Sequence, residues 1–541
     1  MEPQAPVLTN SGPKYVGSIY QAILEEVPSF LEGWRLQALN ISICLSLCLA
    51  SLNFAIVGTS LVVIADDLSG FNRSSWVVTS YLLTYTGFLM SIAKLSDIFS
   101  RKLLFISVLI VFIYFSIGCG VSRSMTMLII MRAFEGIGGG GINAMCFVVL
   151  PEMVPTSKYP LYATVLSSTF AISALLGPLI GGAVSTNGNH TSWRWIFIMN
   201  APGGALALAF VLLGMPQNFP YHRSNKRSTL KNVFTKAKFR RIDFIGAFLL
   251  LASSILFVTA LIEGGTSFSW NSALPPTALS LSGLLCLAFL LWERYLETAK
   301  RPEEGVFPWR LATDRVPMGV LLNTFLAGVV MISVIILLPQ RFQIVNQVSP
   351  IGAGYCLLAL SVVASIGAGI AGVFVQRLEI APFYVILVSS CITTIGLALL
   401  CTLSSSLYVH PSTYGYQVIL GLGIGGTLGS SLLMIPIIVS KQDMAVSMSA
   451  FFQARELGGA LGIAICSNVL NSKIKSSLKG EVTAMQLKAL LKSSQDISIL
   501  PVSLQEDVRL AYAAGFSEQL KVLVGLSGCG ILATFLLWEN L

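Results

Sequence analysis

Long apolar stretches separated by short polar ones recur along the whole chain of 541 residues. A bilayer core about 30 Å thick needs about 20 apolar residues per helix. Stretches such as 41–65 and 161–184 reach that length without one charged side chain. The pattern predicts fourteen transmembrane helices, at approximately 41–65, 75–94, 103–121, 126–150, 161–184, 195–214, 243–263, 274–292, 317–338, 351–375, 383–402, 414–437, 446–470 and 519–538.

The alternative membrane-spanning structure, a barrel, would show alternating segments of about ten residues instead. We therefore expect an all-α polytopic membrane protein. Composition agrees, because 11% of the residues are charged and a soluble domain carries roughly 25%. The ten cysteines lie almost entirely in apolar stretches without a C-x-x-C pair, which indicates packing residues rather than disulfides or a metal site.

Charge predicts the orientation. The loop 215–242 contains HRSNKRSTLKNVFTKAKFRR, with eight Lys or Arg and no acidic residue, and short loops of this kind stay in the cytoplasm. Even-numbered helices should then end in the cytoplasm, together with the segment 1–38, which shows no secretory signal, and the loop 294–316. The glycosylation triplets at Asn72 and Asn189 fall on the opposite side. So does a long loop predicted at 471–518.

Two glycine-rich helices echo each other, since GIGGGGINAM begins at Gly136 and GIGGTLGSSL at Gly423. An internal duplication predicts two six-helix halves, 39–214 and 317–541, with 243–293 as an inserted helix pair. Both stretches match G-x-G-x-x-G, but a dinucleotide site also needs a preceding strand. Small residues at every fourth position instead predict close helix contacts. These residues are Gly136, Gly140 and Ala144 in one helix and Gly421, Gly425 and Gly429 in the other.

Two charged residues, Arg132 and Glu135, lie inside an apolar helix. A charge at mid-bilayer costs about 2.5–3.5 kcal/mol and normally faces a partner or water. Residues three apart share a helix face, and Asn143 returns to the side of Arg132 at roughly 100° per residue. The pattern predicts one polar wall of an aqueous pathway. A structural ion pair that only locks two helices is the alternative.

The next helix contains SALLGPLIGG. Pro178 removes a backbone hydrogen bond, which membrane helices tolerate when neighbours or water satisfy the freed carbonyl. Gly177, Gly181 and Gly182 around it predict a pliable, closely packed seam. A kink without a mechanistic role is the alternative.

Four stretches together carry a family resemblance: AKLSDIFSRK, LIIMRAFEGIGGGG, SALLGPLIGG and WRWIFIMNAPGG. The chain resembles the fourteen-helix drug/proton antiporter branch of the major facilitator superfamily, of fungal type. The resemblance implies export of drugs, toxins or secondary metabolites by alternating access, driven by a proton gradient and without a cofactor. It also implies a cytoplasmic latch formed by Asp97, Arg101 and Lys102, and the GP-x-x-GG motif favours export.

The chain departs from this family at Asn53, where relatives usually carry an aspartate that can bind a proton. Glu135 is therefore our candidate proton carrier, its charge disfavoured by burial and favoured by Arg132. Two further groups are expected around a central cavity. The polar candidates are Gln453, Arg455 and Glu456, and the aromatic side chains that could contact a flat substrate are Trp76, Tyr81 and Tyr85. Snorkelling at the interface and ordinary packing are the alternatives.

These features favour a monomeric exporter in the plasma membrane, with lipid, protons and a small molecule as its partners and no nucleic acid. Vacuolar uptake of basic amino acids is an alternative. A non-transporting sensor is disfavoured by the short internal loops. The phosphate-binding pattern G-x-x-x-x-G-K-[ST] and the hydrolase patterns H-E-x-x-H and G-x-S-x-G are absent, so we expect neither an ATP-driven pump nor an enzyme.

Overall fold

The computed structural model describes residues 30–68, 73, 75–155, 158–186, 193–217, 219–220, 235–264, 268–299, 303–440, 443–478 and 502–538. The first half contains α2 (Gly33–Asp67), α3 (Ser75–Ile98), α4 (Arg101–Gly120), α5 (Met125–Met153), α6 (Tyr159–Thr186), α7 (Arg194–Ile198) and α8 (Asn200–Gly214). The inserted pair is α10 (Phe244–Glu263) and α11 (Leu274–Ala299), and the short helices α9 (Lys236–Phe239) and α12 (Trp309–Thr313) flank it. The second half contains α13 (Arg315–Ile344), α14 (Pro350–Gln376), α15 (Pro382–Leu400), α16 (Ser412–Ile438), α17 (Met444–Ser477), α19 (Val502–Thr534) and the turn η5 (Phe535–Leu537).

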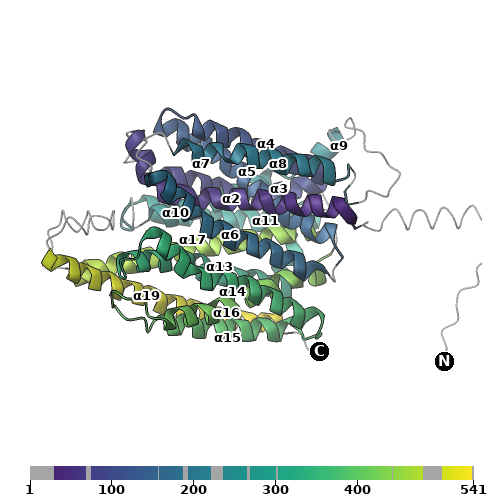
Figure 1. Ribbon diagram of the computed structural model, residues 1–541. Helices are drawn as coiled ribbons and strands as arrows, with labels where there is room; N and C mark the ends of the chain where they lie inside the picture. The colour runs from purple at the N-terminus through teal and green to yellow at the C-terminus, as the bar shows by residue number, and fades with distance from the viewer. Residues whose placement is uncertain are drawn as a thin grey trace, which may run out of the picture.

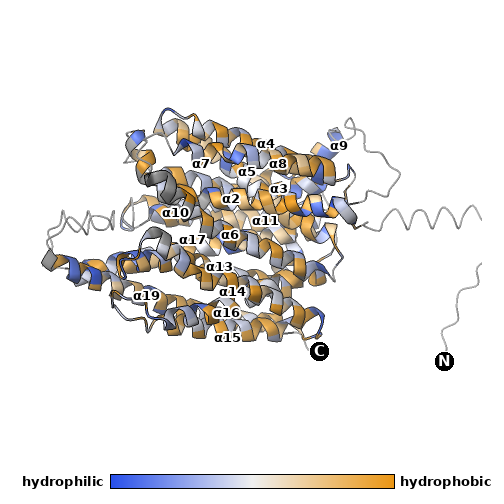
Figure 2. Cartoon of the chain, viewed as in Figure 1, coloured by the Kyte–Doolittle hydropathy of each residue, from blue (hydrophilic) through white to orange (hydrophobic). Residues whose placement is uncertain are grey.

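Each of the fourteen predicted spans coincides with a helix, the sixth with α7 and α8 together. Twelve spans within the described residues are long and apolar enough to cross a membrane. The other two predicted spans fall on α6 and α17. The all-α membrane fold is thus confirmed, and the number fourteen is consistent with it. Hydrophobic residues run along the middle of the helices and hydrophilic ones gather toward their ends (Figure 2).

Several helices extend beyond the apolar stretches that predicted them, because hydropathy detects only the apolar part of a helix and its backbone hydrogen bonds continue into polar residues. Helix α2 begins at Gly33, inside the segment 1–38 assigned to the tail. Helix α11 continues to Ala299, beyond the predicted 293. Of the predicted loop 471–518, the residues up to Ser477 belong to α17 and those from Val502 onward belong to α19, while residues 479–501 lie outside the described chain.

The two halves lie side by side, with α2, α4, α5 and α8 in the upper part of Figure 1 and α13 to α16 and α19 in the lower part. They meet where α6 packs against α14 and where α3 packs against α17. Inside each half the packing is equivalent. Helix α5 packs on α3 as α16 packs on α14, and α6 packs on α2 as α17 packs on α13. Because the same helix pairs pack together in both halves, the structure is consistent with the predicted internal duplication.

Glycines bring these equivalent helices into backbone contact. A Cβ atom at Gly136 or Gly140 would overlap the backbone carbonyl oxygen of Tyr81 or Tyr85 on α3. In the second half a Cβ at Gly421 would lie 2.7 Å from the carbonyl oxygen of a residue on α14. The residues that Gly421, Gly425 and Gly429 meet are Leu360, Ala364 and Ala368, again four apart. The predicted close helix contacts are confirmed.

One end of the bundle, here called the basic end, carries Lys94, Arg101, Arg241 and Arg315. Both halves contribute to a common apolar cluster toward this end, which includes Met153 of α5 and Met434 of α16. The Tyr159 hydroxyl lies 3.9 Å from the Met448 sulfur across the same boundary. The halves are therefore packed together at the basic end.

The inserted pair lies against both halves. On α3, a Cβ at Gly87 would lie 2.7 Å from the Leu251 side chain of α10. On α17, Gln453 donates to the Ser254 hydroxyl of α10 at 3.1 Å. Trp270, between α10 and α11, donates to Asn468 of α17 at 2.7 Å.

Candidate functional site

A buried polar network joins α2 and α5 in the first half. Arg132 and Glu135 have exposed fractions of 0%, and Nη1 of Arg132 lies 3.0 Å from Oε2 of Glu135. Asn53 contacts both partners: its Oδ1 accepts from Arg132 Nη1 at 2.6 Å, and its Nδ2 donates to Oε1 of Glu135. Asn53, which cannot carry a proton, thus holds Arg132 and the candidate proton carrier Glu135 in place.

Three further groups complete this network. Nε of Arg132 donates to the Val77 carbonyl at 3.1 Å, and the Cys119 thiol donates to Oε2 of Glu135 at 3.3 Å. The guanidinium carbon lies 4.1 Å from the centre of the Tyr81 ring, within the range of a cation–π contact. Sequence reasoning missed Val77 and Cys119, because a backbone carbonyl and a lone cysteine give no pattern that predicts such contacts.

The network is sealed in this conformation. Arg132, Glu135 and Asn53 are all buried, so they border other helices here rather than the predicted aqueous pathway. Within the described residues, Nη2 of Arg132 is enclosed without a hydrogen-bond partner. Asn143 is also fully buried, and neither atom of its amide has a partner in the same part of the chain. The structure does not bring Asn143 into the network.

Aromatic rings lead from this network toward the second half. The Tyr81 ring stacks on Tyr85 with 5.7 Å between ring centres. Tyr85 lies on α3, which packs against α17, and it is within electrostatic range of Glu456 and Arg455. Glu456 and Arg455 belong to α17, so this electrostatic interaction crosses the boundary between the halves. Trp76, the third aromatic candidate, is half-buried on α3.

Arg455 and Glu456 pair with each other, with 2.6 Å between Nη2 and Oε1. The guanidinium carbon of Arg455 lies 5.3 Å from the ring centre of Phe170 in the first half and 4.9 Å from that of Phe452 in the second. Its Nε is buried without a partner in the described chain. The Gln453 side chain points elsewhere, toward α10.

The GP-x-x-GG motif lies in α6, where Gly177 is buried. The side-chain surroundings of Pro178, Gly181 and Gly182 lie outside the described residues. The same holds for the two glycosylation candidates, Asn72 and Asn189, in their entirety.

At the basic end, Arg101 joins two carboxylates. Its Nη2 lies 2.5 Å from Asp97 Oδ1 and 2.8 Å from Glu152 Oε1, and its Nη1 donates to the Ser96 hydroxyl at 2.7 Å. Glu152, on α5, was missed by the sequence analysis. Lys102 does not join this cluster. It donates to the carbonyls at the end of α8, those of Leu212 and Met215, at 2.8 and 2.5 Å.

Comparison with known proteins identifies the family. The model described as Major Facilitator Superfamily matches residues 43–463. The chain belongs to the major facilitator superfamily. A relative from Fusarium mangiferae, the MFS-type transporter FPY5, is 42% identical over 525 residues, covering 97% of this chain and 87% of its own. The Aspyridones efflux protein of Neocamarosporium betae is 27% identical over 519 residues, covering 94% and 88%.

Solved structures of other major facilitator proteins share the fold. The human organic anion transporter MFSD10 superposes with a TM-score of 0.56 at 13% identity, covering 94% of this chain and 100% of its own. The proton:xylose symporter XylE gives a TM-score of 0.56 at 12% identity, covering 93% and 95%. At this identity the likeness supports the fold alone.

This major facilitator has a further ion cluster where the inserted pair meets α3. Glu304 follows α11 and lies 3.1 Å from Lys94 Nζ of α3 and 2.5 Å from Arg241 Nη2. Partial burial opposes ionisation of Glu304, but Lys94 and Arg241 outweigh it and lower the pKa of the carboxyl group. The cluster ties the inserted pair to the first half at the basic end.

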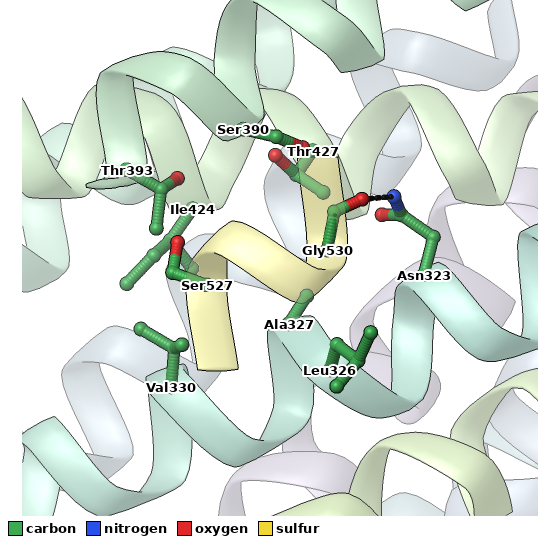
Figure 3. Close-up of a pocket in the computed structure, with 10 residues that line it drawn as sticks. All are labelled: Asn323, Leu326, Ala327, Val330, Ser390, Thr393, Ile424, Thr427, Ser527 and Gly530. Carbon is green, nitrogen blue, oxygen red and sulfur yellow. Dashed lines mark hydrogen bonds between the residues drawn. The ribbon is translucent and has the colours of Figure 1, made fainter. Parts of the chain in front are cut away.

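The second half contains a small cavity, lined by both polar and apolar residues, between α13, α15, α16 and α19 (Figure 3). Asn323 donates to the Gly530 carbonyl at 3.2 Å and to the Thr534 hydroxyl at 2.8 Å. Within the described residues, Oδ1 of Asn323 and the Thr427 hydroxyl are enclosed without partners. The cavity volume of about 20 Å³ suits about one water molecule and is far too small for a transported organic compound.

Proposed function

We propose that this major facilitator exports small organic molecules, such as toxins or secondary metabolites, in exchange for protons. The observation that carries the proposal is the buried pair Arg132 and Glu135, held by Asn53 inside the first half. An ionisable pair at this depth is costly, and in membrane proteins such groups mark ion or substrate routes.

The relatives support export rather than uptake. The Aspyridones efflux protein and the MFS-type efflux pump MFS1 of Trichophyton rubrum carry efflux in their names. The basic loop and the charged cluster at the basic end favour a cytoplasmic location for that end, under the rule that Lys and Arg stay inside. We place the carrier in the plasma membrane, where export removes a compound from the cell.

Coupling would proceed through Glu135. In the sealed state its carboxylate accepts from Arg132, Asn53 and Cys119. A proton on Glu135 removes the negative charge that balances Arg132, so the guanidinium must find other acceptors or water. Tyr81, whose ring lies on Arg132, would pass this rearrangement to Tyr85 and the α17 pair. The proton therefore changes the contacts between the two halves, which alternating access requires.

Closure at the basic end would then correspond to a carrier shut toward the cytoplasm. The cluster of Asp97, Arg101 and Glu152 joins the ends of α3, α4 and α5 within the first half, so it would keep these helix ends together as that half moves. Opening a route to a cytoplasmic substrate would require the Tyr159 hydroxyl to separate from the Met448 sulfur, because this contact joins the two halves.

The test is substrate-driven proton flux in proteoliposomes containing Glu135→Gln. We expect substrate exchange to persist while proton movement is lost, because glutamine keeps hydrogen bonds but carries no proton. The matched control is Glu293→Gln on α11. Glu293 is also buried, at 2% exposed, but accepts from the Phe307 backbone at 3.0 Å in the inserted pair. The control should leave coupling intact.

Undiminished proton flux in Glu135→Gln would show that Glu135 is not the proton carrier. Absence of any substrate-dependent flux in the unmodified carrier, across a panel of organic compounds, would overturn proton antiport itself.

A further inference from the structure

A second cavity lies at the end of the bundle opposite the basic end, within the second half. Its volume is about 190 Å³, and it is bordered by the end of α13, the start of α16 and the connection between α15 and α16. Its lining includes Arg341 and His410 together with hydroxyl groups and aromatic rings, and it contains no Asp or Glu. The cavity is separate from the buried pair of the first half.

Arg341 is the main feature of this cavity. It is 4% exposed, and its Nη2 donates to the carbonyls of Leu403 and Ser404 at 3.3 and 2.9 Å. Among the described residues no carboxylate pairs with Arg341, and its hydrogen bonds are both made by Nη2, which leaves Nε and Nη1 without one. These two nitrogens are also not fully enclosed, so they offer donors to the cavity. A buried charge without a counter-charge is unfavourable.

His410 adds a second donor. Its Nδ1 accepts from the backbone N–H of Ser412 at 3.3 Å and lies 2.9 Å from the hydroxyl of the same residue. A neutral imidazole that accepts at Nδ1 carries its proton on Nε2. The lining therefore presents a guanidinium edge and an imidazole N–H, and it places no acidic group against them. The Thr402 hydroxyl already donates to the Leu399 carbonyl at 2.7 Å and supplies no donor.

We propose that this cavity binds an oxyanion, a carboxylate or phosphate group, on the Arg341 guanidinium. A guanidinium fork matches the two oxygens of such groups and forms strong charge-assisted hydrogen bonds. The volume is below the roughly 300–1,000 Å³ of pockets for drug-sized ligands, so it fits a small anion or the head group of a larger molecule. Soluble anions and anionic lipid head groups share this chemistry.

The chain offers a matched control in Arg509 on α19. This arginine is 7% exposed and also holds outer carbonyls, those of Val345 at 3.2 Å and of Ser405. Its Nε and Nη2 are occupied by Glu506, at 3.0 and 2.5 Å, and it does not line the cavity. Arg509→Gln therefore removes a comparable tether of the same loops without removing the proposed anion partner.

The experiment measures binding to the full-length carrier in neutral detergent with two probes, inorganic phosphate and short-chain phosphatidylglycerol. Phosphatidylcholine serves as the zwitterionic lipid control. We expect the unmodified carrier and Arg509→Gln to bind with equal affinity. Arg341→Gln should bind at least about tenfold more weakly, because hydrogen bonds to a charged group are lost.

Binding of phosphate identifies a soluble anion as the occupant, and binding of phosphatidylglycerol alone identifies a lipid head group; either result supports the site. Unchanged affinity in Arg341→Gln, or no binding of either probe to the unmodified carrier, overturns it. If Arg341→Gln fails to fold, His410→Gln decides. It should bind severalfold more weakly, and an unchanged affinity would again contradict the proposal.

Discussion

Replacing Gly425 with alanine tests whether the close packing of α16 on α14 limits stability. A Cβ atom at this position would overlap the carbonyl oxygen of Ala364 and lie 2.7 Å from its carbonyl carbon and 3.0 Å from its Cα. Ordinary contacts between carbon atoms are about 3.5–4.0 Å. The obstacle is backbone, so no side chain can rotate away, and the two helices must separate by about 1 Å to reach that contact distance.

Overpacking of this kind costs about 1–3 kcal/mol, whereas alanine gains about 1 kcal/mol over glycine through helix propensity. Because the contact is between backbones, we expect the cost to lie toward its upper limit and the net loss to be about 2 kcal/mol. Gly525→Ala is the control. A Cβ at Gly525 on α19 meets nothing within 4 Å, so the same substitution should stabilise the carrier by up to about 1 kcal/mol.

The assay is the thermal unfolding midpoint of each purified variant in the same detergent. The midpoint is read from the fraction of protein that remains monodisperse after heating. Gly425→Ala should unfold below the unmodified carrier and Gly525→Ala at or above it. If Gly425→Ala proved as stable as Gly525→Ala, backbone contact at the glycine stripe would not be the reason for glycine there.

Two further predictions follow from the ion clusters. Tyr81→Phe should retain proton coupling and Tyr81→Leu should impair it, because only the phenyl ring preserves the contact on Arg132, worth about 2 kcal/mol when desolvated; proton flux in proteoliposomes compares them. Glu304→Gln should lower the unfolding midpoint above pH 4.5, the usual pKa of glutamate, where the carboxylate pairs with Lys94 and Arg241. The folded pKa is lowered, so this difference should disappear as pH falls through that lowered value; equal midpoints at neutral pH would contradict it.

The helices and their closest contacts could be predicted from sequence because each depends on a local pattern. Apolar length gave the spans, and small residues four apart gave the contacts of Gly421 with α14. The pairing of Asn53 with Glu135 could not be predicted. It depends on how α2 and α5 are rotated toward each other, and one sequence carries no pattern that records this rotation.

Charge alone also left the partners of each basic residue undetermined. Arg101 and Lys102 are adjacent in sequence, yet α4 directs one toward two carboxylates and the other toward the carbonyls that end α8. In the sequence, Arg341 is only a single charged residue near the end of an apolar stretch. The cavity beside Arg341 could not be predicted, because it is formed by the connection between α15 and α16 lying over the end of α13.

The inserted helices can travel with only one half when the carrier changes state. Trp270 and Ser254 attach them to α17, whereas Glu304 attaches them to α3 at the basic end. If they follow α17, every opening of the basic end must break the bond to Lys94 and every closing must remake it. The bond between Glu304 and Lys94 would then oppose opening of the basic end, so α10 and α11 would influence how long the closed state lasts.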